Sequence, residues 1–274
     1  MAEDVKEKLA RLRERLTSLE SVAVAFSGGV DSTYLLAVAL DALSPKRVLA
    51  VTADSEIHPG WEQGEARELA RKLGVRDRFI TSREMDNPDF VANGPDRCYY
   101  CKRVLLRQLR EVAREEGLHS AVLGDTVDDL GRHRPGMRAA REMGVHSPLL
   151  EAELTKAEVR ELSRECGLPT WDKPPAACLA TRIPYGTPIT LQALKRIEAA
   201  EGFLRDTFNL RQLRVRDYGP IARIEVDSEH IERLIQEEGR DRIVEELRNL
   251  GYQYVTLDLA GFRSGSMDEI LEDE

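Results

Sequence analysis

The sequence lacks several features that would place it in a familiar class. No run approaches the roughly 18 apolar residues of a membrane-spanning helix, and the charged first six residues lack the apolar segment of a secretion signal. No G-x-x-x-x-G-K-S/T motif is present, which excludes the lysine-bearing phosphate loop of many nucleotide hydrolases. We therefore expect a cytoplasmic protein with no membrane association and no loop lysine of that kind.

The net charge and the cysteine content exclude further classes of protein. The 274 residues include 40 Lys and Arg against 49 Asp and Glu, a net charge of −9 that argues against broad nucleic-acid binding. The four cysteines indicate metal or redox chemistry rather than disulfides in a cytoplasmic chain. The length is sufficient for one large domain or two small ones, each with a buried core.

The stretch Ser27-Gly28-Gly29-Val30-Asp31-Ser32 organises the rest of the chain. An apolar run, 22–26, precedes it, and an apolar helical pattern, 34–40, follows it. Glycines let the backbone approach a phosphate, and the first N–H groups of a helix point toward it. The two serines add hydroxyl donors. The S-G-G-x-D-S form resembles the pyrophosphate loop of ATP pyrophosphatases, which cleave ATP to AMP and pyrophosphate and thereby adenylate a substrate.

Strands and helices alternate over the first part of the chain. We expect strands at 22–26, 48–51, 79–81 and 121–123, helices at 5–19, 34–40, 61–73, 99–116 and 155–166, and a polar loop at 83–97. This order predicts an α/β fold, a doubly wound parallel sheet of the adenine-nucleotide hydrolase type. Ligands of such sheets bind beyond the carboxyl ends of the strands, where Ser27, Asp54 and Asp125 are expected.

The order of the expected strands and helices, together with the proline content, divides the chain into three predicted segments. Residues 1–167 form the pyrophosphatase domain, and residues 168–189 form an active-site loop, since 168–188 contain five prolines. Residues 190–274 are expected to form a smaller α+β domain, to which we assign substrate binding and oligomerisation. Its elements are expected at 191–206, 213–215, 222–226, 228–250 and 252–257, followed by an acidic, frayed tail from Ser264.

The cysteine spacing points to a metal or cluster site. Cys98 and Cys101 form a C-x-x-C at the start of a helix, so two thiolates can bind one metal. A four-thiolate zinc site needs a second such pair, and none is present. Cys178 is the best third ligand, and three cysteines fit a 4Fe–4S cluster with one iron open. The alternative is three unrelated structural cysteines, and we assign Cys166 to packing.

Charged residues supply candidate nucleotide ligands. The stretch that begins at Gly124 and contains Asp125 and Asp129 is expected to hold Mg²⁺ or orient the nucleotide, although helix capping is an alternative. Lys156 is expected to neutralise pyrophosphate, although a solvated lysine fits the sequence almost as well. We assign catalytic roles to Asp31, Cys178 and Arg182, because Arg182 is close enough to Cys178 to hold a substrate beside it.

A pair of arginines supplies a candidate phosphate site in the second domain. Arg214 and Arg216 alternate along a strand, so both guanidinium groups emerge on one face, and Glu225 lies on the next strand. Arginines that face one way suit a substrate phosphate. The alternative is a solvated sheet face.

Nearly the whole chain resembles the LarE family, ATP-dependent sulfur transferases of nickel-pincer cofactor biosynthesis. The resemblance rests on the S-G-G-V-D-S loop and on a further set of motifs: 95–102, 124–129, 134–136, 147–149, 154–156, 167–174, 177–186, 214–216 and 222–225. It implies that ATP adenylates a carboxylate of pyridinium-3,5-biscarboxylic acid mononucleotide, that sulfur then displaces AMP, and that a second round gives a dithio acid that binds nickel.

The resemblance also implies how sulfur is supplied. In single-cysteine members of the family, the cysteine that matches Cys178 gives up its own sulfur. Members with three cysteines resemble cluster-dependent enzymes in which a 4Fe–4S cluster carries an extra sulfide, and Cys98, Cys101 and Cys178 place this chain with them. The substrate phosphate would lie on Arg214 and Arg216, with Glu225 beside them. A hexamer, a sulfide donor and the other enzymes of the cofactor pathway are the implied partners.

Three other readings remain at this point. A tRNA thiolase also joins a pyrophosphate loop to three cysteines, but the net charge of −9 and the lack of zinc motifs count against it. A non-catalytic nucleotide sensor would not need the intact loop and the spaced cysteines. Glutamine-dependent amide synthesis would require an ammonia source, and no glutaminase segment is present.

Overall fold

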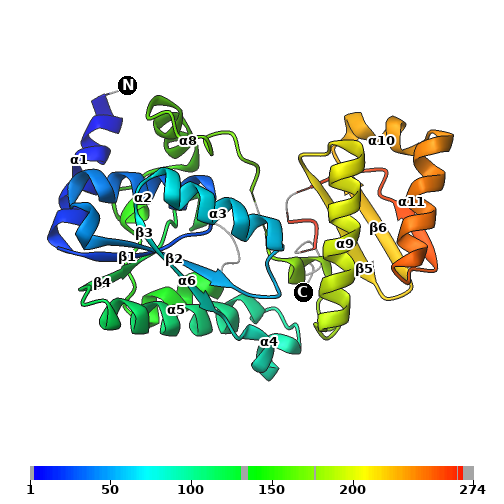
Figure 1. Ribbon diagram of the computed structural model, residues 1–274, viewed down its shortest axis with the longest axis horizontal. Helices are drawn as coiled ribbons and strands as arrows, with labels where there is room; N and C mark the ends of the chain where they lie inside the picture. Colours follow the sequence, from blue (N-terminus) through cyan, green and yellow to red (C-terminus); the bar gives the residue numbers. More distant parts are fainter. Residues whose placement is uncertain (1–2, 131–134, 176, 264, 268–274) are drawn as a thin grey trace. The chain divides into compact units, whose positions relative to one another are not determined.

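The computed structural model describes residues 3–130, 135–175, 177–263 and 265–267. Two compact units make up the chain: Met1–Asn87 with Asp96–Ala176, and Pro88–Pro95 with Ala177–Glu274 (Figure 1). The division falls inside the proline-rich segment. Arg134 of the motif at 134–136 and most of the tail from Ser264 lie outside the described residues.

The first unit is built on a four-stranded parallel sheet, which confirms the predicted α/β fold. The strands lie in the order β3-β2-β1-β4, so that β2 and β1 are the two inner strands (Figure 1). Their bounds are β1 Val22–Ala25, β2 Val48–Asp54, β3 Arg76–Thr81 and β4 Ser120–Val122. Val22 is in register with Val48 on one side and with Ser120 on the other. All four strands are parallel, so their carboxyl ends share one edge, to which the loop after β1 belongs.

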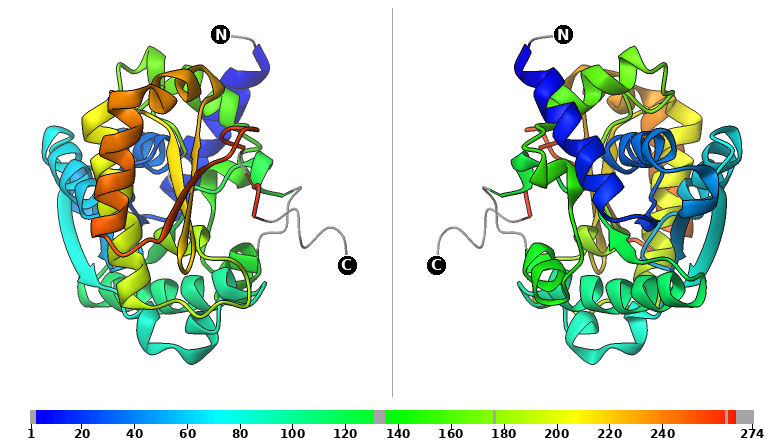
Figure 2. Two further views of the ribbon diagram at one scale, coloured as in Figure 1. Left: turned by 90° about the vertical axis from the view of Figure 1, so that its right-hand side faces the viewer. Right: turned by 90° about the vertical axis from the view of Figure 1, so that its left-hand side faces the viewer.

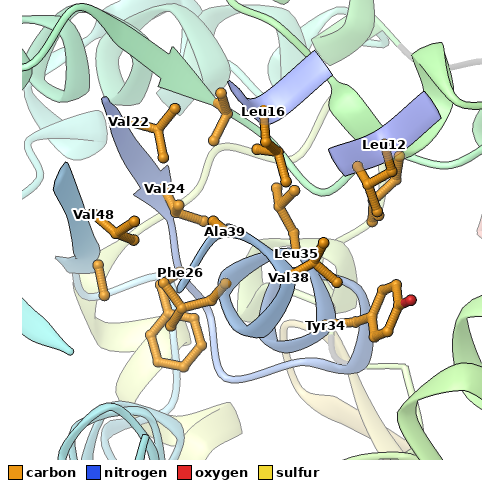
Figure 3. Close-up of a cluster of buried hydrophobic side chains, with 14 of the residues drawn as sticks. Leu12, Leu16, Val22, Val24, Phe26, Tyr34, Leu35, Val38, Ala39 and Val48 are labelled. Atoms are coloured by element: carbon orange, nitrogen blue, oxygen red, sulfur yellow. The ribbon is translucent and has the colours of Figure 1, made fainter. Parts of the chain in front are cut away.

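Helices cover both faces of this sheet. The larger core joins α1 Glu3–Ser18, α2 Val30–Ala42, α3 Gly60–Lys72 and α8 Lys156–Glu165 to one face, and the second core joins α5 Arg97–Glu115 and α6 Pro135–Glu142 to the other. The alternation along β1 explains this, because Val22 and Val24 enter the first core while Ala23 enters the second. Figure 3 shows Val22 and Val24 facing Leu35 and Val38 of α2, and Figure 2 shows α1 beside α2.

The prediction of a loop at 83–97 was wrong. These residues form η2 Glu84–Asp86 and α4 Pro88–Val91, and α5 already begins at Arg97. Proline is well suited to a first helical position, since its missing N–H would have no partner there. Four further elements of the first unit were not predicted: η1 Pro45–Arg47, η3 Val127–Asp129, α6 Pro135–Glu142 and α7 Pro148–Glu151. β3 also begins earlier than expected, at Arg76.

One buried side chain and the backbone around it attach the segment Pro88–Pro95 to the rest of the second unit. The Asn93 amide donates to the carbonyls of Ile183, Pro184 and Thr187, at 3.3, 2.8 and 2.8 Å. A backbone bond from Ile189 N–H to Val91 O, at 2.8 Å, continues the attachment. These partners are about 90 residues away along the chain, which is why the local pattern did not reveal them.

The second unit is a small α+β structure, as expected. β5 Leu213–Tyr218 and β6 Ile221–Val226 are antiparallel, and β7 Tyr254–Leu257 pairs parallel to β6. The helices are α9 Leu191–Phe208, α10 Ser228–Ile235 and α11 Glu237–Asn249, with the single turn η4 Leu179–Arg182 before them. α9 and α11 share a core with one face of the sheet (Figures 1 and 2). No helix among the described residues is long and apolar enough to cross a membrane.

Candidate functional site

The loop between β1 and α2 needs glycine at one position. Gly28 has a φ of 67°, in the left-handed region that glycine adopts at little cost. A Cβ atom there would also lie 3.2 Å from the Cα of Ala66 in α3. The loop closes on itself through Ser32, whose hydroxyl accepts from Ser27 N–H at 3.3 Å and lies 3.2 Å from the Ser27 hydroxyl. Two serine hydroxyls therefore lie together at the N-terminus of α2.

A second glycine brings the end of β4 against the same helix. A Cβ on Gly124 would lie 3.0 Å from Ser32 N and 3.2 Å from Asp31 C. Both atoms belong to the backbone of the first turn of α2, so they cannot rotate away. Gly124 therefore sets the distance between the acidic stretch after β4 and the serine-glycine loop.

Asp31, in the first turn of α2, uses only one of its two carboxylate oxygens for a contact among the described residues. Its side chain is 20% exposed, and its Oδ2 lies 3.3 Å from Lys156 Nζ. Its Oδ1 is buried with no hydrogen-bond partner among the described residues. Burial raises the pKa of Asp31 above its ordinary value of 3.8, and Lys156 opposes that rise. A buried carboxylate oxygen without a donor fits a divalent cation such as Mg²⁺, which prefers oxygen ligands.

The acidic residues after β4 divide between two tasks. Asp129 Oδ2 accepts from Thr126 N–H at 2.9 Å in a capping box, which is the capping alternative that the sequence left open. Asp128 Oδ2 accepts from Lys156 N–H at 2.7 Å, at the N-terminus of α8. Asp125 is different, because Oδ2 accepts from the Ser147 hydroxyl at 2.8 Å. Asp54 is exposed at the end of β2.

The N-terminus of α8 carries Lys156 to the loop. Thr155 caps this helix as predicted, since its side chain accepts from Glu158 N–H and the Glu158 carboxylate accepts from Thr155 N–H. A further lysine reaches the loop from the segment after α8. The Lys173 ammonium donates to Gly28 O at 3.1 Å and to Glu65 at 2.9 Å. Lys173 lies within the motif at 167–174, and nothing in the local sequence indicates its contact with a residue 145 positions away.

Cys98 and Cys101 lie in the first turns of α5, as the spacing predicted. Cys98 is exposed, Cys101 is half-buried, and neither is in a disulfide. Gly136 at the start of α6 packs on this turn, because a Cβ there would lie 3.6 Å from Cys98 O. Two thiols three residues apart on a helix share a face and are suitable ligands for iron. No three His, Cys, Asp or Glu side chains in the described parts of the chain are grouped to hold a metal ion.

Cys178, in the second unit, sits at the N-cap of the single turn η4. Arg182 is buried behind this turn. Its Nη1 donates to Ala177 O and Cys178 O, at 2.6 and 2.9 Å, and Nε and Nη2 form a two-pronged ion pair with Glu201. The Arg182 side chain is 3% exposed, so its guanidinium holds the backbone at Cys178.

Arg216 supports the same turn from the sheet. Its Nη1 donates to Thr181 O at 2.9 Å, and its Nη2 binds Glu225 at 2.6 Å and Ser266 at 3.0 Å. Arg223, opposite Arg216 in the register, also binds Glu225, at 2.8 Å. Glu225 is fully buried between them.

The remaining arginine of the predicted pair is less enclosed. Arg214 is half-buried, donates to Leu213 O at 2.7 Å, and lies over the Phe262 ring. Arg216 and Arg223 both form ion pairs with Glu225, and Arg223 also lies 3.7 Å from Asp258, while Arg214 is opposite Glu225 in the strand register. The shared face of Arg214 and Arg216 is as the strand alternation predicted, but Arg216 already has an ion-pair partner.

Comparison with known proteins places these features in a family. The model of the asparagine synthase family matches residues 5–110. An uncharacterized protein of Synechocystis is 40% identical over 97% of this chain and 99% of its own length. The pyridinium-3,5-bisthiocarboxylic acid mononucleotide synthase of Lactiplantibacillus plantarum is 38% identical, covering 96% of this chain and 95% of the relative. An uncharacterized protein of Methanocaldococcus jannaschii is 28% identical over 94% and 98%.

Proposed function

The chain belongs to the LarE family, and from that premise we propose that it inserts sulfur into pyridinium-3,5-biscarboxylic acid mononucleotide at the expense of ATP. ATP adenylates a substrate carboxylate and releases pyrophosphate, and sulfur then displaces AMP to leave a thiocarboxylate. A second round gives the dithio acid that binds nickel. The observation that carries the proposal is the serine-glycine loop, with Gly28 in its left-handed conformation and the uncompensated Oδ1 of Asp31 beside it.

The residues of the first unit suit the adenylation step. A carboxylate is a poor electrophile, and transfer of AMP to one oxygen makes that oxygen part of a leaving group. Ser27 and Ser32 provide hydroxyl donors, the N-terminus of α2 provides N–H groups, and Lys156 provides a cation for the departing pyrophosphate. Asp31, with Asp125 nearby in the sheet topology, provides oxygen ligands for Mg²⁺.

For the sulfur step, we assign Cys98, Cys101 and Cys178 as ligands of a 4Fe–4S cluster. The donor set fits, since thiolates are the usual ligands of such clusters, and three of them leave one iron open. When bound, the cluster would supply a sulfide that is nucleophilic at neutral pH. The alternative is that Cys178 gives up its own sulfur, and the two routes differ in what happens to the mass of the chain.

The second unit suits substrate binding beside Cys178. Arg182 and Arg216 both donate to backbone carbonyls of residues 177–181. We propose that their role is to position the Cys178 thiol. Arg214, opposite Glu225 in the strand register and less enclosed than Arg216, is assigned to the phosphate of the mononucleotide. These roles predict that Arg214→Ala raises KM for the mononucleotide and leaves KM for ATP unchanged.

The nucleotide products test the adenylation step. Purified protein is incubated with MgATP, sulfide and the dicarboxylate mononucleotide, and the nucleotides are separated. We expect AMP and pyrophosphate that form only when the mononucleotide is present. ADP and phosphate as the products, or AMP formation with bulk tRNA in place of the mononucleotide, would contradict the proposal.

Iron content tests the sulfur route. Protein purified without oxygen is expected to contain about four irons per chain and to show the broad visible absorption of a cluster. Cys98→Ala and Cys101→Ala are each expected to lose both the iron and the sulfur transfer, and to retain AMP formation. The assignment of Cys166 to packing was wrong, because Cys166 is an exposed thiol at the C-cap of α8, which makes Cys166→Ala a matched control. Sulfur transfer without iron, together with loss of one sulfur from the chain at Cys178, would establish the sacrificial route instead.

The assembly remains a prediction. The family resemblance implies a hexamer, and we propose that the second unit contributes to it. Sedimentation of the purified protein over a range of concentrations tests this, and a monomer at every concentration would contradict it.

A further inference from the structure

Lys173 brings a cation to a phosphate loop that has no lysine of its own. Its Nζ lies 3.1 Å from Gly28 O, and its side chain is 19% exposed. The only other protein partner that the described residues give it is Glu65 of α3, at 2.9 Å. An ammonium group has three N–H donors, so two hydrogen bonds leave one donor of Lys173 for a ligand.

The chain holds Lys173 in this place by a dedicated contact. Arg160 of α8 donates from Nη1 to Trp171 O and from Nη2 to Lys173 O, both at 2.8 Å. The turn that carries Lys173 is therefore fastened to the helix whose first residue is Lys156. The two lysines consequently reach the loop from one continuous segment, Lys156 at Asp31 and Lys173 at Gly28.

Glu65 is a weak partner for this lysine. Its side chain is 55% exposed, and ion pairs of such exposure contribute little, because water solvates both charges. A phosphate group presents more negative charge than one carboxylate and accepts charge-assisted hydrogen bonds. Bound triphosphate would therefore compete with Glu65 for the Lys173 ammonium.

We propose that Lys173 binds the β- and γ-phosphates of ATP, and that Glu65 is the counter-ion it exchanges for them when ATP arrives. This inference rests on the proposed use of ATP. Lys173 takes no part in bond making. It stabilises the negative charge of the pyrophosphate as that group departs, and it returns to Glu65 after release. Arg160 is a positioning residue, since it acts through the backbone of 171–173.

A purely structural role makes a different prediction. If the Lys173–Glu65 pair only ties α3 to the segment after α8, removal of either partner should have the same effect. If Lys173 binds phosphate, the two substitutions should have opposite effects on ATP affinity, because one removes the cation and the other removes its competitor.

The experiment measures the binding of MgATP and of AMP by calorimetry, with no pyridinium substrate present. Lys173→Met is expected to weaken ATP binding roughly 10- to 100-fold, the range for a lost charge-assisted hydrogen bond, and to change AMP binding less than about twofold. Glu65→Gln is expected to tighten ATP binding, and Lys173→Met with Glu65→Gln together should match Lys173→Met alone. Lys72→Met is the control. Lys72 is an exposed lysine on α3, the helix that carries Glu65, and it is paired with Glu68.

Two outcomes would overturn the inference. One is equal weakening of ATP and AMP binding by Lys173→Met, and the other is weakening of ATP binding by Glu65→Gln. If Lys173→Met does not fold, Lys173→Arg and Glu65→Gln decide the question, because arginine keeps the charge and should retain most ATP affinity. Failure of the proposed function is distinguished separately: the unsubstituted protein would then bind ATP yet form no AMP with the mononucleotide.

Discussion

Replacement of Arg182 by methionine tests how the turn at Cys178 is held. Arg182 is 3% exposed, its partner Glu201 is 12% exposed, and its Nη1 also donates to two backbone carbonyls. Removal of one partner of a buried ion pair typically costs about 3–5 kcal/mol, because the other charge stays buried. We therefore expect Arg182→Met to lower the free energy of unfolding of the second unit by about 3–5 kcal/mol.

A companion variant isolates the charge that is left behind. Glu201 Oε1 also accepts from Val215 N–H at 2.9 Å, a bond that glutamine can keep. Arg182→Met with Glu201→Gln is therefore expected to recover about 1–2 kcal/mol relative to Arg182→Met, because no unpaired charge remains buried. Arg240→Met is the control. Arg240 is exposed on α11 beside Asp241, and a change of at most about 0.5 kcal/mol is expected.

The two units can be followed separately in urea. The tryptophans, Trp61 and Trp171, both lie in the first unit, so their fluorescence reports that unit, while circular dichroism reports both. Arg182→Met should move the dichroism transition and leave the fluorescence transition in place. It should also lower sulfur transfer about 100-fold through misplacement of Cys178, with AMP formation preserved. An unfolding free energy within about 0.5 kcal/mol of the unsubstituted protein would refute the reasoning.

Three further predictions concern the first unit. Thr155→Ala removes the cap of α8 and should cost about 1 kcal/mol in the fluorescence-detected unfolding of that unit; no change would mean that the cap contributes nothing. Gly124→Ala places a Cβ 3.0 Å from Ser32 N and should weaken ATP binding, measured by calorimetry, and unaltered affinity would show that the acidic stretch need not approach the loop so closely. Burial raises the pKa of Asp31 above 3.8. The folded chain therefore binds the proton of the Asp31 carboxyl more tightly than the unfolded chain does. Ionisation of Asp31 consequently lowers the free energy of unfolding as pH rises from about 3.8 through the folded pKa. Asp31→Asn should therefore be more stable at neutral pH and lose AMP formation; a less stable variant would contradict the assigned cause.

Local patterns were sufficient for the loop, the parallel sheet and the helix caps. Gly28 and Thr155 act within a few residues of their own positions, so residue type and spacing predict their conformation. The strand alternation likewise predicted that Arg214 and Arg216 share a face. The alternation does not reveal the ion-pair partners of these arginines, because a partner depends on which carboxylate the fold brings close. Arg216 is already paired with Glu225.

Long-range contacts account for what the sequence did not reveal. Asn93 joins Pro88–Pro95 to the second unit through carbonyls about 90 residues away, and Lys173 reaches Gly28 across 145 residues. Neither contact leaves a periodic signal, since each depends on a single side chain. The sequence places Lys173 in a motif, but its contact with Gly28 could be identified only from the fold.

If adenylation activates the carboxylate, AMP release and sulfur insertion must be coupled one to one. Anaerobically purified protein is given MgATP, sulfide and the dicarboxylate mononucleotide, and AMP and thiocarboxylate are quantified in the same reaction, the second by mass spectrometry. We expect one AMP for each oxygen replaced by sulfur. AMP formed without any thiocarboxylate, or thiocarboxylate formed without AMP, would contradict it.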